Sequence, residues 1–328
     1  MPYCRKFNCI IHFETKKLMN QVRGSIMEHI IEVKNLKKYF NNIKAVDDIS
    51  FQVEKGQLYG FLGVNGAGKS TTINILCTLL EKAEGEVTIC GYQLGKNDRD
   101  IRRKIGVVFQ DNTLDSRLTI KENLITRASL YHSDTKQINK NLNHVCEILN
   151  IGDLLNRQFR KLSGGQRRRC EIAKALMNTP EILFLDEPTT GLDPQTRQHV
   201  WDSIETLRKE ENMTVFLTTH YMEEAAKAQQ IAIIESGKLV AEGSPYELKQ
   251  NYASDIVKLV PKDLSNMMET LKEMGHHYEE RSNHIRVYIS DTLQGLDLLN
   301  VVRDNLSHFE VVQGTMDDVF LNVTGRML

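Results

Sequence analysis

The sequence predicts an α/β domain with a largely parallel sheet, followed by a smaller α+β unit. Up to about residue 243, short apolar stretches alternate with amphipathic ones, and several apolar stretches are continuous, as in buried parallel strands. Beyond that residue the order changes to strand, helix, two strands, helix and strand. A chain of 328 residues is long enough for one larger and one smaller domain.

The elements of the larger domain follow from hydrophobic periodicity. Residues 29–36 and 49–56 alternate apolar and polar side chains, which predicts two strands with a turn near Asn41 and Asn42. The helical pattern is clearest within residues 118–162. Further strands are predicted over 56–63, 85–94, 104–111, 181–188, 213–220 and 230–237, and further helices over 69–80 and 199–210.

The smaller unit, residues 244–328, has the second pattern. Its strands are predicted over 256–260, around 278, over 285–289 and over 309–313, with helices over 264–274 and 293–306. A last helical turn is expected to close it.

Composition and charge indicate a reduced, cytosolic protein without a general affinity for nucleic acid or membranes. A net charge of −1 gives no general attraction to nucleic acid or anionic membranes, so we interpret the basic run 167–169 as a solvated helix face. Six scattered cysteines without metal-binding spacing are typical of a reduced, cytosolic protein. No apolar stretch approaches the roughly 18 residues of a membrane helix. Residues 1–27 are expected to be an extension that a misassigned translation start would explain, because regular alternation begins directly after Met27.

A phosphate-binding loop is the first chemical signal. The stretch GVNGAGKST fits G-x-x-x-x-G-K-[ST] and lies between a predicted strand and a predicted helix. Its backbone N–H groups are expected to surround phosphate oxygens, with Lys69 reaching the β- and γ-phosphates and Ser70 coordinating Mg²⁺. The residues of this loop are Gly63, Val64, Asn65, Gly66, Ala67, Gly68, Lys69, Ser70 and Thr71.

Two adjacent carboxylates end the apolar stretch ILFL. Neighbouring residues on a strand point to opposite sides, so Asp186 and Glu187 are expected to have different roles. Asp186 is predicted to bind Mg²⁺. Glu187 is predicted to orient or deprotonate the water that attacks the γ-phosphate.

Three further residues gain meaning from their order along the chain. Gln110 and His220 each end a predicted strand, where Gln110 could reach the metal and the attacking water and His220 the γ-phosphate. Tyr39 precedes the loop, where its ring could stack on adenine or belong to the core.

Together with LSGGQ (Leu162–Gln166), these motifs resemble, in residues and order, the nucleotide-binding subunit of an ATP-binding cassette (ABC) protein over about residues 28–243. The resemblance implies an ABC-type P-loop NTPase fold with a helical subdomain near residues 111–165. It also implies a head-to-tail dimer in which one subunit closes over the ATP of the other. The residues contacting ATP in trans would be Ser163, Gly164, Gly165 and Gln166, and Asp193 would link the two sites.

The end of the chain narrows the family. GTMDDVFLNVTGR is similar to the tail of daunorubicin-resistance-type subunits, which serve ABC-2 exporters of drugs, lipids or polysaccharides. This resemblance implies an ATPase that uses ATP and Mg²⁺, a second ATPase subunit and a separate permease as partners, and a cytoplasmic location at the inner face of the cell membrane. No nucleic acid is expected.

Two alternatives stay open at this stage. A phosphotransferase shares the phosphate loop, but it does not need the LSGGQ motif. A regulatory or nucleic-acid-associated ABC protein without a permease has the same motifs, although the sequence lacks a long basic stripe.

Overall fold

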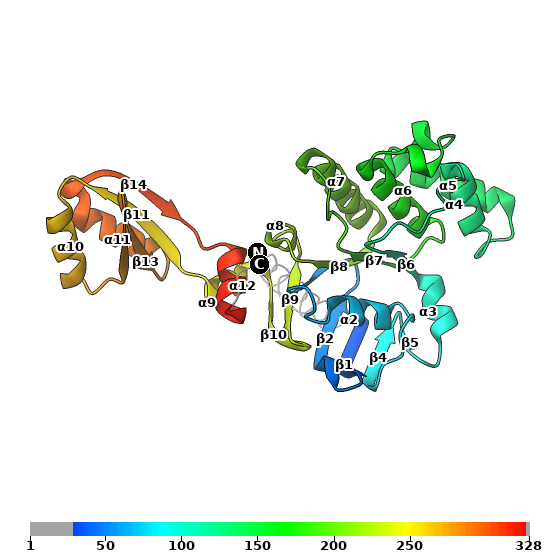
Figure 1. Cartoon of the computed structure of the whole chain (residues 1–328), viewed down its shortest axis with the longest axis horizontal. Coiled ribbons are helices and arrows are strands. Elements are labelled where there is room, and N and C mark those ends of the chain that lie inside the picture. Colours follow the sequence, from blue (N-terminus) through cyan, green and yellow to red (C-terminus); the bar gives the residue numbers. More distant parts are fainter. Residues whose placement is uncertain (1–28, 326–328) are drawn as a thin grey trace, which may run out of the picture.

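The computed structural model describes residues 29–325, which form three β-sheets and the helices packed on them (Figure 1). The extension expected over residues 1–27 lies outside this range. Two sheets build a larger body, and the third lies to one side in a smaller unit (Figure 1). None of the described helices is long and apolar enough to cross a membrane.

The central sheet has six strands in the order β10-β9-β3-β8-β7-β6. Its neighbours pair in parallel except β10 with β9, so the prediction of a largely parallel sheet is confirmed. The antiparallel edge strand β10 was not predicted from its pattern. The strands are β3 (Leu58–Leu62), β6 (Ile105–Val108), β7 (Ile182–Asp186), β8 (Thr214–Thr219), β9 (Gln230–Glu235) and β10 (Lys238–Gly243).

The two faces of the central sheet enter different hydrophobic cores because strand side chains alternate. Tyr59 and Phe61 pack with the second sheet and with α2 (Lys69–Leu76). Leu58 and Leu62 pack on the other side, where helices supply the core. The helices on that side include α6 (Gly164–Leu176), α7 (Pro194–Glu211), α8 (Met222–Ala225) and α9 (Pro245–Tyr252).

The second sheet is antiparallel, in the order β2-β1-β4-β5. Its strands are β1 (His29–Phe40), β2 (Ile43–Glu54), β4 (Glu84–Ile89) and β5 (Tyr92–Gln93). The predicted turn at Asn41 and Asn42 is confirmed. The strand predicted over 85–94 is divided because Cys90 and Gly91 have positive φ angles of 50° and 77°.

The segment predicted to be helical, residues 118–162, is helical in the structure. It contains α4 (Ile120–Ala128) and α5 (Thr135–Leu149), which pack on each other and on α6. Thr119 and Glu122 form a capping box at the start of α4, which satisfies backbone donors that the helix cannot. Before this segment, the short helix α3 (Asp98–Lys104) was not predicted.

The smaller unit has the β-α-β-β-α-β order of a ferredoxin-like fold. Its antiparallel sheet runs β12-β13-β11-β14, and the predicted order of elements is confirmed. The elements are β11 (Asp255–Pro261), α10 (Leu264–Glu273), β12 (Tyr278–Arg281), β13 (His284–Ile289), α11 (Thr292–Val302) and β14 (Leu306–Val312).

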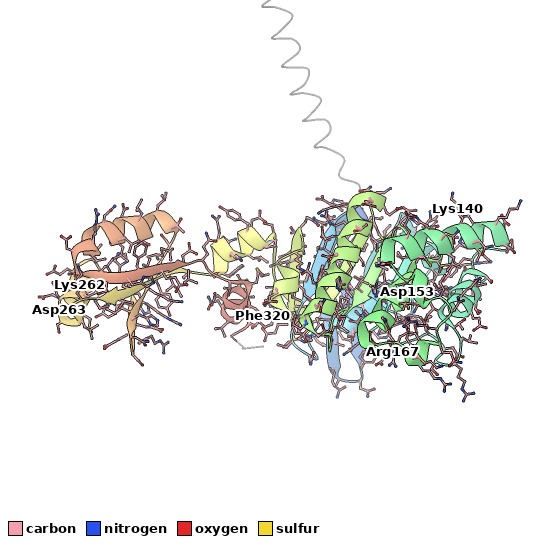
Figure 2. The ribbon with its side chains drawn as sticks, turned by 90° about the horizontal axis from the view of Figure 1, so that it is seen from above. Lys140, Asp153, Arg167, Lys262, Asp263 and Phe320 are labelled. Carbon is pink, nitrogen blue, oxygen red and sulfur yellow. The ribbon has the colours of Figure 1, made fainter. Side chains whose placement is uncertain are left out.

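The last helix, α12 (Met316–Thr324), returns to the larger body. Val319 and Phe320 are buried in the same core as Leu248 of α9, and Figure 2 shows Phe320 between the larger body and the third sheet. Asn322 Nδ2 donates a hydrogen bond to the carbonyl of Tyr252 at 2.7 Å. The chain therefore enters the ferredoxin-like unit from α9 and leaves it into α12, two helices that pack together.

Candidate functional site

The predicted phosphate loop links β3 to α2 through residues 63–68. Gly66 and Gly68 have φ angles of 82° and 113°, which residues with a side chain rarely adopt. A Cβ atom at Gly68 would also lie 2.4 Å from the carbonyl oxygen of Ala45. Glycine is thus required for the turn and for close packing, and the N-terminus of α2 lies directly behind the loop.

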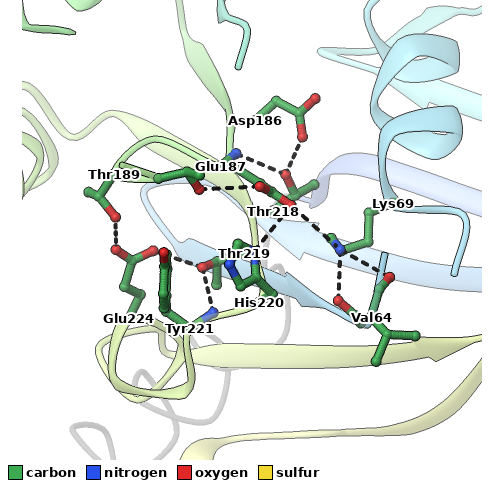
Figure 3. Close-up of polar contacts among 12 residues, drawn as sticks. Val64, Lys69, Asp186, Glu187, Thr189, Thr218, Thr219, His220, Tyr221 and Glu224 are labelled. Atoms are coloured by element: carbon green, nitrogen blue, oxygen red, sulfur yellow. Dashed lines mark hydrogen bonds and ion pairs between the residues drawn. The ribbon is translucent and has the colours of Figure 1, made fainter. Parts of the chain in front are cut away.

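Lys69 is buried at the start of α2, with its ammonium group inside the loop (Figure 3). Nζ donates to the carbonyls of Gly63 at 2.7 Å and Val64 at 3.2 Å, and it lies 3.7 Å from Glu187 Oε1. Burial lowers the pKa of Lys69, and the charges of Glu187 and Asp186 oppose that shift. The cation is thus held by groups that a phosphate oxygen can replace.

Glu187 is the meeting point of this cluster. Oε1 lies 3.3 Å from His220 Nδ1, and Oε2 accepts a hydrogen bond from Thr190 Oγ1 at 3.2 Å. Its backbone N–H donates to the carbonyl of Thr218 at 3.1 Å, and its φ is 45°. Such a left-handed conformation is uncommon outside glycine and is found preferentially at functional sites.

Asp186 has different partners. Its carboxylate accepts a hydrogen bond from Thr218 Oγ1, and burial raises its pKa, with a further contribution from the charge of Glu187. Because Glu187 lies one residue beyond β7 with a positive φ, its direction is set by this turn and not by strand alternation.

Among the described residues, the other residues predicted near the nucleotide make no polar contact with Lys69, Glu187 or His220. Ser70 is exposed in the first turn of α2, and Tyr39 is half-buried near the end of β1. Gln110 is exposed two residues beyond Val108, where β6 ends, so it follows the strand and does not end it. Within residues 29–325, no polar contact connects Gln110 to Glu187.

The candidate metal ligands are oxygen donors. Among the described residues, no group of three or more His, Cys, Asp or Glu side chains could hold a metal ion. The predicted set is instead the hydroxyl of Ser70, the carboxylate of Asp186 and the amide of Gln110. Mg²⁺ prefers oxygen ligands and commonly takes few from the protein and the rest from water and substrate phosphates, so this donor set fits Mg²⁺ bound together with a nucleotide.

The LSGGQ motif begins α6. Ser163 Oγ accepts from the backbone N–H of Gln166 at 3.4 Å, and the Gln166 side chain accepts from the N–H of Ser163 at 3.1 Å. A Cβ atom at Gly165 would lie 2.1 Å from Thr196 Cγ2 on α7, whereas one at Gly164 would meet its nearest atom at 3.6 Å. Gly165 is therefore required by packing within the chain, and Gly164 leaves an open approach.

The basic run that follows is only partly solvated, so the expectation of a solvated face is wrong for Arg168. This side chain is 6% exposed, and burial lowers its pKa to about 10. Its guanidinium donates at 2.5–3.2 Å to four backbone carbonyls, those of Phe109, Asp186, Glu187 and Pro188. Arg168 thus holds the loop before Gln110 and the loop at Glu187 against the helix that starts with LSGGQ.

One turn further along α6, Glu171 anchors the loop after Gln110. It accepts hydrogen bonds from the backbone N–H groups of Thr113 at 2.6 Å and Leu114 at 2.9 Å, and from Lys174 Nζ at 2.8 Å. Burial alone would raise the pKa of Glu171, but the charge and hydrogen bond of Lys174 and the backbone donors hold it below its ordinary value.

A second buried carboxylate, Glu224, lies behind Glu187. It accepts hydrogen bonds from Thr189 Oγ1, from Thr219 Oγ1 at 2.8 Å and from Trp201 Nε1 at 3.4 Å. These contacts connect the segment after Glu187 to β8 and α7. At the start of α7, Asp193 is exposed and accepts from the backbone N–H of Thr196 at 3.0 Å. The side chain of Thr196, and then this backbone donor, lower the pKa of Asp193.

Sequence reasoning missed Arg168, Glu171, Thr218 and Glu224. Thr218 gave a faint signal, because a polar pair at the end of an apolar strand is unusual. The three charged residues gave none, since charged side chains in helical segments are mostly exposed.

Two family models match the chain. The first, described as ABC transporter, matches residues 46–190, and the second, described as ATP-binding protein DrrA1-3-like, C-terminal domain, matches residues 243–324. The two models thus fall on the larger body and on the ferredoxin-like unit with its flanking helices.

Similar proteins cover nearly the whole chain. The daunorubicin/doxorubicin resistance ATP-binding protein DrrA of Streptomyces peucetius is 37% identical over 306 residues, which are 90% of this chain and 92% of the relative. The Nod factor export ATP-binding protein I of Cupriavidus metallidurans is 33% identical, covering 92% of this chain and 99% of the relative. Among solved structures, the dimeric post-hydrolysis state of the cassette MJ0796 bound to ADP and Pi aligns with a TM-score of 0.59 and 29% identity over 65% of this chain and 98% of that one.

Proposed function

Because this chain belongs to the DrrA-like family of ABC transporter ATP-binding proteins, we propose that it works with a separate ABC-2-type permease at the cytoplasmic face of a cell membrane. The chain is an ABC ATPase that hydrolyses ATP to power export. The observation that carries the proposal is the match of residues 243–324 to the C-terminal domain of DrrA1-3-like ATP-binding proteins. The convergence of Lys69, Glu187 and His220 behind the phosphate loop supports the ATPase chemistry.

Each residue of the cluster has a role in hydrolysis. The backbone N–H groups of residues 63–71 bind the phosphates, and Lys69 exchanges the carbonyls of Gly63 and Val64 for β- and γ-phosphate oxygens. Water forms a new P–O bond at the γ-phosphate, the bond to the β-phosphate oxygen breaks, and ADP and phosphate leave. Glu187 accepts the proton of the attacking water, and His220 hydrogen-bonds the γ-phosphate.

Nucleotide binding brings further residues into the site. Ser70, Asp186 and Gln110 would hold Mg²⁺, whose charge would stabilise the negative charge on the phosphate oxygens. The ring of Tyr39 stacks on adenine.

The complete site requires a second copy of the subunit. Ser163, Gly164, Gly165 and Gln166 contact the γ-phosphate bound to the other copy, and Asp193 connects the two sites. Supporting this, the LSGGQ loop makes no polar contact with Lys69 or Glu187 of its own chain among the described residues, and Gly164 is open to approach. The cassette MJ0796, to which this chain is similar, was solved as a dimer.

A charge at Ser163 tests the composite site. Ser163→Arg blocks closure over the second ATP, so ATP binding to the single subunit stays and turnover is lost. The matched control is Ser282→Arg, which changes an exposed serine in the ferredoxin-like unit and keeps turnover. Unchanged ATPase activity of Ser163→Arg would refute a site shared between two copies.

The permease docks in a groove of about 550 Å³ beside the loop that follows Gln110. The groove lies between β6, α4 and α6, and its lining includes the apolar side chains of Ile105, Leu114 and Leu118. Leu79 and Leu130 at its margin are 59% and 70% exposed and extend the apolar lining of the groove into a surface that a partner would cover.

The experiment that tests the exporter function is a pull-down of the tagged chain from native membranes in gentle detergent. A stoichiometric membrane protein with several spans is the expected partner, and Leu130→Asp reduces its recovery while ATP binding stays unchanged. Recovery of ribosomes, DNA or a soluble protein instead would leave the ATPase chemistry standing and overturn the coupling to a permease.

A further inference from the structure

The sheet of the ferredoxin-like unit has two edges that differ in protection. The edge strand β12 is four residues long, and three of its residues are charged, namely Glu279, Glu280 and Arg281. The opposite edge strand, β14, is seven residues long, has neither Pro nor Lys, and exposes Phe309 by 49% and Val311 by 39%. Short charged edges resist pairing, whereas long apolar edges invite it.

The exposed side chains of β14 continue a buried surface. Phe309 is the cross-strand partner of Leu259, and Val311 is that of Val257. Cross-strand partners share a face, and both partners on β11 are fully buried under the helices. The core thus reaches the edge of the sheet without being covered there.

The helix next to this edge also exposes large apolar side chains. The helix α11 contacts β14, and it exposes Leu293 by 73%, Leu296 by 55% and Val301 by 60%. Within residues 29–325, no other strand pairs with the free edge of β14.

We propose that the free edge of β14 pairs with the same edge of a second copy of this chain, which joins two four-stranded sheets across a two-fold axis. An antiparallel pair centred on Phe309 places the two Phe309 rings opposite each other on the apolar face. On the other face, His308 lies opposite Glu310 of the second copy, and Glu310 opposite the second His308. The strand is therefore self-complementary in charge and in shape, as a two-fold interface requires.

The dimers formed by related cassettes also favour a second copy of this chain as the partner of β14. Related cassettes form dimers, so two β14 edges are present in each assembled ATPase. A linked second contact raises the effective concentration of the first. Pairing through β14 needs no nucleotide, which separates it from the ATP-dependent closure of the cassettes proposed above.

Light scattering on the nucleotide-free full-length chain in EDTA tests this interface. At about 100 µM protein, a concentration that detects a Kd of that order or tighter, the wild type is dimeric and Phe309→Lys is monomeric. Glu280→Lys, on the protected edge, is the matched control and stays dimeric. A monomeric wild type, or a Phe309→Lys variant that remains dimeric, overturns the proposal.

A cross-link locates the contact. Opposed Cβ atoms in an antiparallel pair lie about 4.5–5.5 Å apart, close to the reach of a disulfide. Oxidised Phe309→Cys is expected to give covalent dimers without nucleotide, whereas Glu280→Cys and the wild type, with its six native cysteines, do not. Equal cross-linking at both edges overturns the proposal.

The two dimer contacts can be told apart. ATP is added to Glu187→Gln with and without Phe309→Lys. If the cassettes close as proposed, both variants dimerise with ATP, and only the one with an intact β14 edge dimerises without it. A variant with both Glu187→Gln and Phe309→Lys that stays monomeric with ATP, beside a Glu187→Gln variant that is dimeric without it, would refute the composite site and leave the β14 contact standing.

Discussion

The larger body and the ferredoxin-like unit differ in what they bury. The larger body encloses charged side chains that hold loops in place: Lys69, Arg168, Glu171, Lys174, Asp186 and Glu224. Among the described residues after 244, every buried side chain other than glycine is apolar, and the ion pairs there, such as Lys258 with Glu310, lie at the surface.

This difference separates residues kept for function from residues kept for stability. A buried charge costs free energy unless its partners are well placed, and apolar replacements are often as stable or more so. In the larger body the buried charges join the loops at Gln110 and Glu187 to the helix that starts with LSGGQ. The ferredoxin-like unit has no such loops to join, and its nine-residue core of apolar side chains suffices.

The largest expected effect is on turnover, in Glu187→Gln. The variant keeps the shape of the side chain but removes the proton acceptor, so ATP hydrolysis falls by about 10²-fold or more. ATP binding remains, and ATP traps a dimer. Phosphate release measures turnover and equilibrium ATP binding measures affinity. Light scattering of Glu187→Gln combined with Phe309→Lys, which lacks the β14 contact, detects the dimer that ATP traps.

The control for this variant lies at the other end of the same strand. Glu181 precedes β7 and forms an exposed pair with Lys104 at 2.6 Å. Glu181→Gln is expected to keep full activity. Wild-type turnover in Glu187→Gln would remove Glu187 from the role of base.

Arg168→Met gives the next largest effect. It removes the guanidinium donor from four carbonyls, and the contacts to Asp186 and Pro188 are the fully buried ones. The free energy of unfolding is therefore expected to fall by about 1–3 kcal/mol for each buried carbonyl left unsatisfied. Turnover falls as well, because the loops at Gln110 and Glu187 lose their common anchor. Denaturant unfolding and phosphate release measure these changes.

Its neighbour is the matched control. Arg169 donates to the carbonyls of Leu149 and Asn150 at the end of α5, away from the nucleotide. Arg169→Met is therefore expected to keep turnover. Equal activity losses in both variants would show that Arg168 acts only through general stability.

The same contrast decides what could be predicted from sequence. The elements of the ferredoxin-like unit were predicted in order because alternation of apolar residues determines which face of each strand is buried. The phosphate loop and the Asp186–Glu187 pair were found because their local spacing carries the chemistry. Arg168 and Glu224 could not be found, since their partners lie 18–59 and 5–35 residues away and only the fold brings them together.

Leu259→Ala tests the independence of the smaller unit. Leu259 is fully buried in its core, and removal of a buried leucine side chain costs about 3 kcal/mol. Hydrogen exchange in β11 and β13 should accelerate, while turnover of the isolated ATPase stays unchanged. A loss of turnover would mean that the two regions are coupled.

The smallest expected effect is on stability. It compares the contributions of two ionised carboxylates, Asp186 in the larger body and Glu310 in the ferredoxin-like unit, which are expected to have opposite signs. Burial raises the pKa of Asp186, so its charged form costs stability at pH values above the ordinary aspartate pKa. The hydrogen bond and charge of Lys258 lower the pKa of Glu310, so its charge adds stability that is lost as the pH falls through its lowered pKa. Neutralising the two groups should therefore have opposite effects.

At pH 7 without nucleotide, Asp186→Asn is expected to raise Tm, because the amide oxygen can still accept the hydrogen bond of Thr218. Glu310→Gln is expected to lower Tm slightly, since Glu310 is exposed and its pair with Lys258 is screened by solvent. The gain in Asp186→Asn relative to wild type should shrink as the pH approaches the raised pKa. A lower Tm in Asp186→Asn would mean that the charges of Lys69 and Arg168 compensate for the burial of Asp186. The ionised carboxylate of Asp186 would then not lower the stability of the protein.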